Sequence, residues 1–453
     1  MKFIIPEEVK QILSSFEDKG YEIYIVGGAV RDLIMGRVIT DWDFTTNTTP
    51  EQILKVIPDG YYNNQFGTVG LASKSFPKPF EITTYRTERG YSDFRRPDTI
   101  SWGKTLEEDL LRRDFTINAI ALSSPKGHGS NLEIFDPYNG QKDIDSKTIR
   151  AVGEPTERFS EDALRMMRAV RIASELGFII EEKTFEAIKA NSTLINKIAR
   201  ERVKDELIKI FSSPNPYEGM VMFRNSGLLA EILPEMEKAF GVDQKSPQRH
   251  HIYDVGTHSL MALKHCKSQD WVTRFATFIH DIGKPTTYKK LETGVITFYN
   301  HEMVGTTIAK SIAERLRFSK KDTDKLLTLV RWHQFTVDER QTDSAIRRFI
   351  THVGKENIEE MLALRTGDRL GGGASETSWR LEEFKKRIIE VQKEPFSIKD
   401  LKIDGNDVMR ELSIKPGPEL GEILEKLFKE VVEKKLENEK DILLRRLGLL
   451  RRQ

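Results

Sequence analysis

The chain has 453 residues, of which 31% are charged, and its formal net charge is +1. This length allows two to four domains, and the small net charge means that any nucleic-acid surface has to be a local basic patch. The single cysteine, Cys266, excludes a disulfide framework and a cysteine-based zinc site. There is no signal-peptide pattern, and no apolar run reaches the roughly 18–20 residues that span a bilayer. We therefore predict a cytoplasmic protein without a membrane partner.

The first part of the chain combines short β-rich runs with helical patterns, which predicts an α+β domain. The β-rich runs are 21–28, 41–46, 68–73 and 80–86. Residues 25–46 read as a strand, a Gly-Gly turn, a short helix and a second strand that carries Asp41 and Asp43. Alternate residues of a strand share a face and lie roughly 7 Å apart. Both carboxylates can therefore reach two Mg²⁺ ions that lie about 3.5–4 Å apart.

The same segment can also bind a triphosphate. Glycines in the turn let backbone amides approach a phosphate chain, and Arg31 can bind it with several donors. A glycine-rich turn followed by Asp-x-Asp is the combination that nucleotidyl transfer needs. Either feature alone would be a weak signal.

Further charged residues of this domain can serve the same site. Glu81, in the run 80–86, is a candidate third carboxylate near the metal ions, with an exposed strand charge as the alternative. Residues 106–122 place acidic residues and arginines ahead of an apolar helix. Within them, Arg113 suits a triphosphate because a guanidinium binds phosphate oxygens in pairs, with a surface ion pair as the alternative. Residues 135–144 predict a tight turn.

The rest of the chain is almost wholly helical in pattern. In residues 158–178, Asp162, Arg165 and Arg168 recur every three positions and share one face of a predicted helix, from which Arg171 departs slightly. An aspartate beside an arginine can hydrogen-bond to the Watson–Crick edge of a base, and the other arginines can bind the triphosphate. A solvated helix face with ion pairs is the alternative.

Taken together, these segments resemble the bacterial CCA-adding enzymes of the class II tRNA nucleotidyltransferase and poly(A) polymerase family. The motifs GGAVRD…DWD, RRDFTINAIA, FDPYNG, EDALRMMRAVR and ARERVKDEL stand in the order and spacing of that family, and the resemblance covers nearly the whole chain. It implies an N-terminal nucleotidyltransferase palm of the polymerase-β type, followed by an all-α neck, body and tail.

The resemblance also implies an activity and a set of site residues. The protein would add C, C and A to the 3′ end of tRNA from CTP and ATP without a nucleic-acid template. The counterparts of Asp41 and Asp43 bind the catalytic Mg²⁺ ions in that family, and those of Asp162 and Arg165 read C and then A. The other positions that match nucleotide-binding residues are Gly28, Arg31, Arg113, Arg168 and Arg171. The tRNA would be held by shape and phosphate contacts, with Lys and Arg of 409–452 contributing.

Several alternatives stay open. Residues 86–97 resemble a loop that CCA-adding and A-adding enzymes retain and CC-adding relatives lack, which argues against a CC-only enzyme. Arg95 and Arg96 in this loop can act in the reaction cycle or can be plain surface. Addition of the terminal A alone, or poly(A) synthesis on other RNA, are the nearest alternative activities. A non-catalytic RNA-binding scaffold is disfavoured because both aspartates are present.

The middle of the chain carries a second group of potential metal ligands. Its pattern H…HD…D, set in helices, resembles the HD phosphohydrolase superfamily. The resemblance implies that four residues bind a divalent metal ion of unknown identity and that the site hydrolyses phosphate esters, including 2′,3′-cyclic ends. These four residues are His258, His280, Asp281 and Asp368. His301 and His333 can complete a second metal site.

A vestigial HD fold that only binds tRNA is the alternative, and an enzyme that acts mainly as an HD phosphohydrolase is the candidate from another class. An alarmone-type regulator is disfavoured because the transferase motifs come first. The predicted boundaries are 1–155 for the nucleotidyltransferase head, 156–244 for the neck and start of the body, 245–370 for the HD domain, and 371–453 for a helical tRNA-binding tail.

Overall fold

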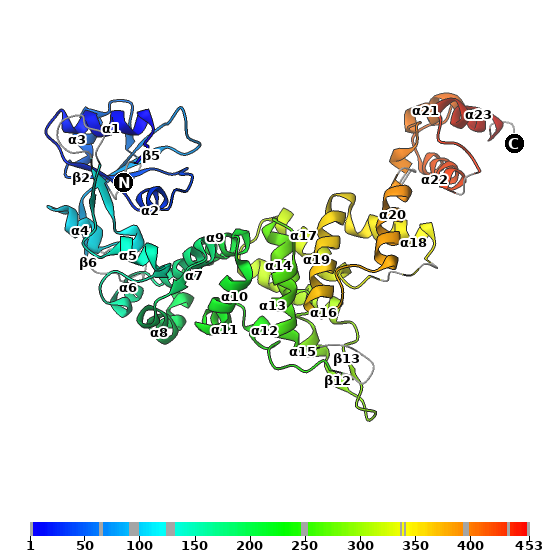
Figure 1. Ribbon diagram of the computed structural model, residues 1–453. Helices are drawn as coiled ribbons and strands as arrows, with labels where there is room; N and C mark the ends of the chain where they lie inside the picture. The colour runs from blue at the N-terminus through cyan, green and yellow to red at the C-terminus, as the bar shows by residue number, and fades with distance from the viewer. Residues whose placement is uncertain are drawn as a thin grey trace.

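The computed structural model describes residues 3–62, 67–89, 99–123, 132–245, 252–335, 338, 341–392, 398–432 and 435–450. The chain runs from a mixed α/β head, through a helical middle, to a small group of helices at the C-terminus (Figure 1). This arrangement confirms the predicted fold class. No helix among the described residues is long and apolar enough to cross a bilayer.

The head is built on a seven-stranded sheet with the order β3-β4-β5-β2-β1-β8-β9. Its strands are β1 (Ile23–Val26), β2 (Asp43–Thr46), β3 (Tyr61–Tyr62), β4 (Thr68–Leu71), β5 (Phe80–Thr84), β8 (Ala121–Ser123) and β9 (Glu133–Phe135). The β2–β5 pair is parallel, and the other pairs of this sheet are antiparallel. The strands β1, β2, β4 and β5 fall within the four predicted β-rich runs.

The remaining elements of the head surround this sheet. They are α1 (Glu7–Glu17), α2 (Gly28–Ile34), α3 (Pro50–Val56), β6 (Arg86–Arg89), β7 (Thr99–Trp102), α4 (Leu106–Leu111), η1 (Thr116–Asn118), α5 (Gly140–Asp145) and β10 (Thr148–Ile149). The predicted strand, Gly-Gly turn and helix are confirmed: β1 ends at Val26, Gly27 has a φ of +73° that favours glycine, and α2 follows.

One predicted element of the head is wrong. The apolar stretch that follows Arg113 forms η1 and strand β8 instead of a helix. β8 pairs with β1 and β9, and Ala121 and Leu122 are fully buried. A buried strand reads as a continuous apolar run, which periodicity cannot distinguish from a buried helix. The predicted tight turn before α5 is confirmed, because Asp136 accepts hydrogen bonds from the N–H groups of Gly140 and Gln141 at 2.7 and 2.9 Å.

The neck and body are helical, with two short strand pairs. Their elements are α6 (Pro155–Glu161), α7 (Leu164–Leu176), β11 (Ile179–Ile180), α8 (Glu182–Asn191), η2 (Ser192–Lys197), α9 (Arg200–Ser212), α10 (Pro216–Asn225), α11 (Leu228–Ile232), α12 (Pro234–Glu237), α13 (Val255–His265), α14 (Trp271–Ile279), α15 (Lys284–Thr287), β12 (Lys289–Lys290), β13 (Ile296–Thr297), α16 (His301–Arg315), α17 (Lys320–Trp332), α18 (Asp343–Val353), η3 (Lys355–Asn357), α19 (Ile358–Gly371) and α20 (Trp379–Gln392).

The tail has a hydrophobic core of its own. It comprises η4 (Ile398–Asp400), α21 (Gly405–Leu412), α22 (Pro418–Val432) and α23 (Lys440–Leu450), which pack around a cluster that includes Val408, Leu427 and Leu443. Helix α20 lies outside this cluster: its Phe384 and Ile388 belong to the main core that extends through head, neck and body. The hydrophobic contacts of α20 are therefore with the body, and the tail boundary at residue 371 stays a prediction.

Candidate active site and metal centre

A pocket of about 280 Å³ lies where the head meets the neck. The head contributes Gly27, Gly28, Asp43, Arg112, Arg113, Asp114 and Asn118 to its wall, and the neck contributes Asp162, Arg165, Arg168 and Arg202. Six of the nine residues predicted for the transferase site therefore line one pocket: Gly28, Asp43, Arg113, Asp162, Arg165 and Arg168. A wall with this many guanidinium groups suits a polyphosphate.

Asp43 is the carboxylate that the sheet of the head contributes to this pocket. It begins β2, opposite Val26 on one side and Glu81 on the other. Burial, and then the charge of Asp41, raises the pKa of Asp43 to about 6. A buried carboxylate beside a second negative charge favours a bound cation, and oxygen donors are the ligands that Mg²⁺ prefers. Glu81 adds to the same electrostatic effect, as expected for its position beside the pair.

Asp41 was predicted to lie on the same strand as Asp43, but it does not. It precedes β2 instead of lying on the strand, because the antiparallel partner β1 ends at Val26, opposite Asp43. Its Oδ2 accepts a hydrogen bond from Lys78 Nζ at 2.6 Å, and both side chains are about half exposed. Asp41 is therefore close enough to affect Asp43 while its charge is partly balanced by Lys78.

Arg113 is both an ion-pair partner and a pocket residue. Its Nη2 donates to Asp109 Oδ2 at 3.2 Å, and Arg112 Nη2 donates to Asp109 Oδ1 at 2.6 Å. Asp109 is fully buried, which by itself raises the pKa of its carboxyl, but the two guanidinium groups lower that pKa overall. This anchor holds Arg113 against the turn, where a Cβ at Gly27 would lie only 3.1 Å from Nη1.

A chain of hydrogen bonds links the head to the neck beside the pocket. Arg31 Nη1 donates to Asn118 Oδ1 at 2.9 Å, and Asn118 Nδ2 donates to Asp114 Oδ1 at 3.1 Å. Arg168 Nε then donates to Asp114 Oδ2 at 2.8 Å. Arg31 does not line the pocket itself but contacts it through Asn118. Sequence reasoning missed Asp114 and Asn118, although polar residues inside the buried run DFTINAIA were a signal.

The predicted helix over residues 158–178 is broken at Asp162. Helix α6 ends at Glu161, Asp162 is extended with φ −135° and ψ 103°, and α7 begins at Leu164. The prediction of one continuous helical face is therefore wrong. Asp162 prefers this position because its side chain satisfies a helix N-terminus: Oδ1 accepts a hydrogen bond from Leu164 N at 3.0 Å.

Asp162 and Arg165 nevertheless lie side by side at the pocket. Arg165 N donates to Asp162 O at 3.0 Å, and Arg202 Nη2 from α9 donates to Asp162 Oδ2 at 3.0 Å. Arg165 is nearly buried and donates to Glu161 Oε2 at 2.6 Å and to Arg112 O at 2.9 Å. Arg112 and Arg202 were not predicted from the sequence.

Arg171 is a predicted site residue that does not line the pocket. Its Nε donates to Glu206 Oε2 at 2.6 Å and its Nη1 donates to Glu175 Oε2 at 2.8 Å. It thus connects α7 to α9 within the neck. Arg95 and Arg96 lie outside the described residues.

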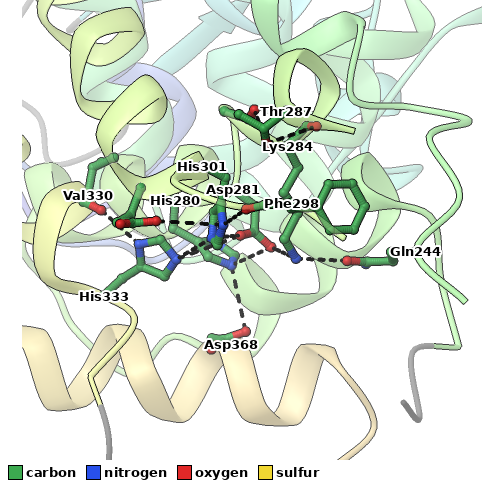
Figure 2. Close-up of polar contacts among 12 residues, drawn as sticks. Gln244, His280, Asp281, Lys284, Thr287, Phe298, His301, Val330, His333 and Asp368 are labelled. Carbon is green, nitrogen blue, oxygen red and sulfur yellow. Dashed lines mark hydrogen bonds and ion pairs between the residues drawn. The ribbon is translucent and has the colours of Figure 1, made fainter. Parts of the chain in front are cut away.

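A second group of potential metal ligands lies in the body, around the end of α14. Among the described residues, two groups of three potential ligands have their atoms within 4.8 Å of one another: His258, His280 and Asp368, and Asp281, His301 and His333. All six were identified from the sequence. They come from α13, the end of α14, the start of α16, the end of α17, and α19, and Figure 2 shows five of them converging.

Close backbone packing brings these elements together. A Cβ at Gly283 would lie 2.1 Å from the backbone oxygen of His301, so only glycine allows the segment after Asp281 to approach α16 this closely. His258 Nε2 lies 3.1 Å from Asp368 Oδ1 and 3.3 Å from His280 Nε2.

His280 is oriented by the backbone. Its Nδ1 donates to the carbonyl oxygen of Thr277 at 2.7 Å, which turns Nε2 toward the cluster. Burial disfavours the charged imidazole, but Asp281 and Asp368 raise the pKa of His280 to about 10. The buried Asp281 and the partly buried Asp368 thus favour a nearby cation, and imidazole with carboxylate is a donor set for first-row divalent metals.

Three known families match parts of this chain. Residues 23–150 match the family described as "Poly A polymerase head domain", and residues 177–240 match "Probable RNA and SrmB- binding site of polymerase A". Residues 293–447 match the family of tRNA nucleotidyltransferase domain 2. The first two matches lie in the head and in the neck, and the third extends from the body into the tail.

Solved structures share the fold. The Bacillus stearothermophilus CCA-adding enzyme in complex with CTP has a TM-score of 0.69 and 27% identity, and the match covers 99% of this chain and 98% of that one. The Thermotoga maritima CCA-adding enzyme complexed with tRNA has a TM-score of 0.62 at 20% identity, covering 99% and 97%.

Curated relatives match along their whole length. The CCA-adding enzyme of Ligilactobacillus salivarius is 33% identical over 97% of this chain and 96% of its own. That of Levilactobacillus brevis is 34% identical over 97% of this chain and 98% of its own. Together with a head pocket that joins Asp43 to the arginines of the neck, this similarity establishes that the chain belongs to the family of CCA-adding enzymes.

Proposed function

We propose that this protein adds C, C and A in turn to the 3′ end of tRNA, using CTP and ATP and the head pocket as its active site. The observation that carries the proposal is the pocket itself, in which Asp43 of the sheet faces Asp162 and Arg165 of the neck. The reacting phosphate and the base that must be selected can therefore be held within one pocket. We also propose that it acts in the cytoplasm, where the buried Cys266 stays reduced.

Asp41 and Asp43 are the proposed Mg²⁺ ligands, with Glu81 as a neighbouring carboxylate. Mg²⁺, when bound, supplies activation of the tRNA 3′-hydroxyl and stabilises charge on the pyrophosphate leaving group. In each cycle the 3′ oxygen forms a bond to the α-phosphorus, the bond from that phosphorus to the bridging oxygen of pyrophosphate breaks, and the hydroxyl proton is lost.

The arginines of the pocket bind the triphosphate in this proposal. Arg113 is anchored by Asp109 beside Gly27, and Arg168 is anchored by Asp114. A guanidinium that is already oriented by a buried carboxylate loses little freedom when it binds phosphate. Asp162 and Arg165 read the base, with Arg202 positioning Asp162.

The test uses purified protein with Mg²⁺ and tRNA that ends at the discriminator base, at C or at CC. Each tRNA is offered single nucleotides and the CTP–ATP mixture, and the 3′ ends are sequenced. We expect orderly addition of C, C and A that then stops. Growth from the CC end alone would replace this proposal with an A-adding enzyme, and long runs of A would indicate a poly(A) polymerase.

A second activity is favoured by the ligand cluster of the body. We propose that His258, His280, Asp281 and Asp368 bind one divalent metal ion and that this HD-type site hydrolyses phosphate esters. The four side chains are buried or nearly so, and the Nε2 atoms of the two histidines lie 3.1 to 3.6 Å from the carboxylate oxygens of the two aspartates. Loading the full-length protein with Mn²⁺, followed by desalting and metal analysis, tests the site; absence of bound metal would reject it.

A further inference from the structure

The active-site pocket lies on one side of Asp43 in the sheet of the head. Asp43 is on β2, the strand between β1 and β5. Gly27 and Gly28, which follow β1, line the pocket together with Arg113, whereas none of the described residues of β3, β4 or β5 does. In phosphoryl transfer the attacking and leaving oxygens are roughly in line on either side of the phosphorus atom. Because we place the triphosphate on the β1 side, the attacking hydroxyl has to reach Asp43 from the β5 side.

On that side, a row of residues crosses the sheet from Asp43 to its edge strand. Asp43 is paired with Glu81 on β5. Glu81 is paired with Gly70 on β4, and Gly70 is paired with Tyr61 on β3. Directly paired residues share a face of a sheet, and the next residue of each strand lies on the opposite face. The opposite face here is the core face, whose residues on β2, β5 and β4 are Phe44, Ile82 and Val69.

The side chain of Tyr61 extends along this row toward the carboxylates. A Cβ at Gly70 would lie 2.5 Å from Cζ of Tyr61 and 2.7 Å from its hydroxyl oxygen. The far end of the side chain therefore lies above β4, and Tyr61 points from β3 in the direction of Glu81. Only glycine leaves room for the ring at this position. The side chain of Tyr61 is nevertheless 45% exposed, so much of the ring is accessible to a ligand.

The ring lies within the reach of one nucleotide from Asp43. Neighbouring strands are about 4.8 Å apart, so Gly70, two strands away from Asp43, is at a distance of roughly 10 Å. A nucleotide whose 3′-oxygen lies at Asp43 can therefore place its base at the ring above β4. An aromatic ring stacks on any base, because every base has a π face. This tolerance suits an RNA end whose last base changes as nucleotides are added.

The next residue, Tyr62, provides an internal comparison. It is 47% exposed, almost as much as Tyr61. However, Tyr62 is paired with Val69 of the core face, so its side chain starts on the opposite face of the sheet. The two tyrosines are thus alike in residue type, strand and exposure, and they differ in whether they share a face with Asp43.

We propose that Tyr61 binds the 3′-terminal nucleotide of the tRNA by stacking on its base, and thereby positions the attacking 3′-hydroxyl at Asp43. The inference rests on the nucleotide addition proposed above and adds a binding site for the RNA end on the β5 side of the carboxylates. Tyr61 takes no proton and forms no covalent bond in this role. The incoming nucleotide stays in the pocket between head and neck, where Tyr61 does not reach it.

A kinetic cycle that combines a protein variant with a modified tRNA tests the stacking contact. The two tRNAs end at CC, and in one of them the last nucleotide lacks its base but keeps its 3′-hydroxyl. For AMP addition by wild type, we expect loss of the base to lower kcat/KM for tRNA about tenfold. Tyr61→Ala should show about the same loss with the intact tRNA, and less than a twofold further loss with the abasic one.

Two further variants separate stacking from other roles of the residue. Tyr61→Phe keeps the ring and should behave as wild type, and so should Tyr62→Ala, the matched control. Losses that simply multiply in Tyr61→Ala would mean that the ring does not contact the base, and would overturn the proposal. A rise in KM for ATP in place of the effect on tRNA would assign the ring to the incoming nucleotide and would overturn it as well.

An alanine at position 70 tests the placement of the ring with the tyrosine still present. Gly70 does not have a positive φ, so its backbone accepts alanine, but the added Cβ would displace the ring. We expect Gly70→Ala to lower kcat/KM for the intact tRNA as Tyr61→Ala does, without a further loss in the double variant. A wild-type response of Gly70→Ala to removal of the base would contradict this placement. The midpoint of thermal unfolding checks that each variant folds, and Tyr61→Leu replaces Tyr61→Ala if the latter does not.

A binding measurement tests the site without any nucleotide addition. The probe is an RNA hairpin with a single-stranded 3′ end whose last base is 2-aminopurine, which loses fluorescence when it stacks on an aromatic ring. We expect wild type, Tyr61→Phe and Tyr62→Ala to quench the bound probe and Tyr61→Ala to leave it bright. Quenching that depends on Tyr61 in a protein that adds no nucleotide would reject the proposed function and retain the RNA-end site. Addition of C, C and A without such quenching would overturn this inference alone.

Discussion

Arg168 of α7 donates from Nε and Nη2 to a single oxygen of Asp114, at 2.8 and 2.5 Å. The pair crosses from the neck to the head beside the active-site pocket. Asp114 is buried, whereas about a third of the Arg168 side chain is exposed. Although burial disfavours its charged form, the charge of Arg168 holds the pKa of Asp114 well below its usual range. This ion pair therefore fixes the arginine that we assign to the triphosphate.

Replacing Asp114 with asparagine should loosen that arrangement. We expect Asp114→Asn to reduce the free energy of unfolding by about 2 kcal/mol at pH 7 and to raise KM for CTP and ATP. Because the folded pKa of Asp114 is lowered, its stabilising effect is present above pH ~4 and is lost as the pH falls below that value. Urea unfolding at pH 7 and pH 3 should show a difference from wild type that shrinks in acid. The exposed Asp59→Asn serves as a control without such a difference.

The raised pKa of Asp43 predicts that the stability of the fold depends on pH in the opposite direction. A carboxyl whose folded pKa is about 6 destabilises the fold once it ionises, so its favourable contribution is lost as the pH rises from about 4 to 6. We expect Asp43→Asn to abolish nucleotide addition and yet to stabilise the protein at pH 7.5 without Mg²⁺, by up to about 3 kcal/mol. Thermal unfolding with and without Mg²⁺ checks this, and Mg²⁺ should stabilise wild type more than the variant. A less stable variant would contradict the electrostatic interpretation.

Asp162 should control which base is accepted. We expect Asp162→Ala to reduce discrimination against UTP and GTP by roughly 5- to 100-fold, the scale of a paired base contact, with a smaller effect on KM for CTP. Arg202→Gln should have a weaker effect of the same kind, since it frees Asp162 Oδ2 without removing it. Asp205→Asn, exposed on the same helix α9, is the matched control. Unchanged selectivity among nucleotides in Asp162→Ala would contradict the assignment of Asp162 to base reading.

Arg171 should matter for stability more than for nucleotide binding. Arg171→Gln leaves the carboxylate of Glu206, which is 5% exposed, without its strongest partner. We expect a loss of about 2–4 kcal/mol in the free energy of unfolding, with KM for CTP and ATP within twofold of wild type. Lys209→Gln, which also removes a partner of Glu206 but from an exposed side chain, should have a small effect. A tenfold rise in KM without lost stability would instead support the nucleotide-binding role inferred from the sequence.

The sequence alone identified the residues from which both sites are proposed. The strand and glycine turn before Asp41 and Asp43 are local patterns, since a strand alternates its side chains and a positive φ favours glycine. The order of motifs identified the family, and the imidazoles and carboxylates of the body are candidate ligands by residue type. These features depend on neighbours in the chain, so they can be derived without knowing what packs against them.

Only the tertiary structure decided how these residues combine. His258 and Asp368 meet although 110 positions separate them, and Asp281 directs its two oxygens to different pairs of histidines because α16 packs against Gly283. Asp162 and Arg171 both have ion-pair partners on α9, and Arg171 faces its partner there and not the pocket. Periodicity gives the direction of a side chain relative to its own helix axis, but the element it faces is set by packing between distant segments.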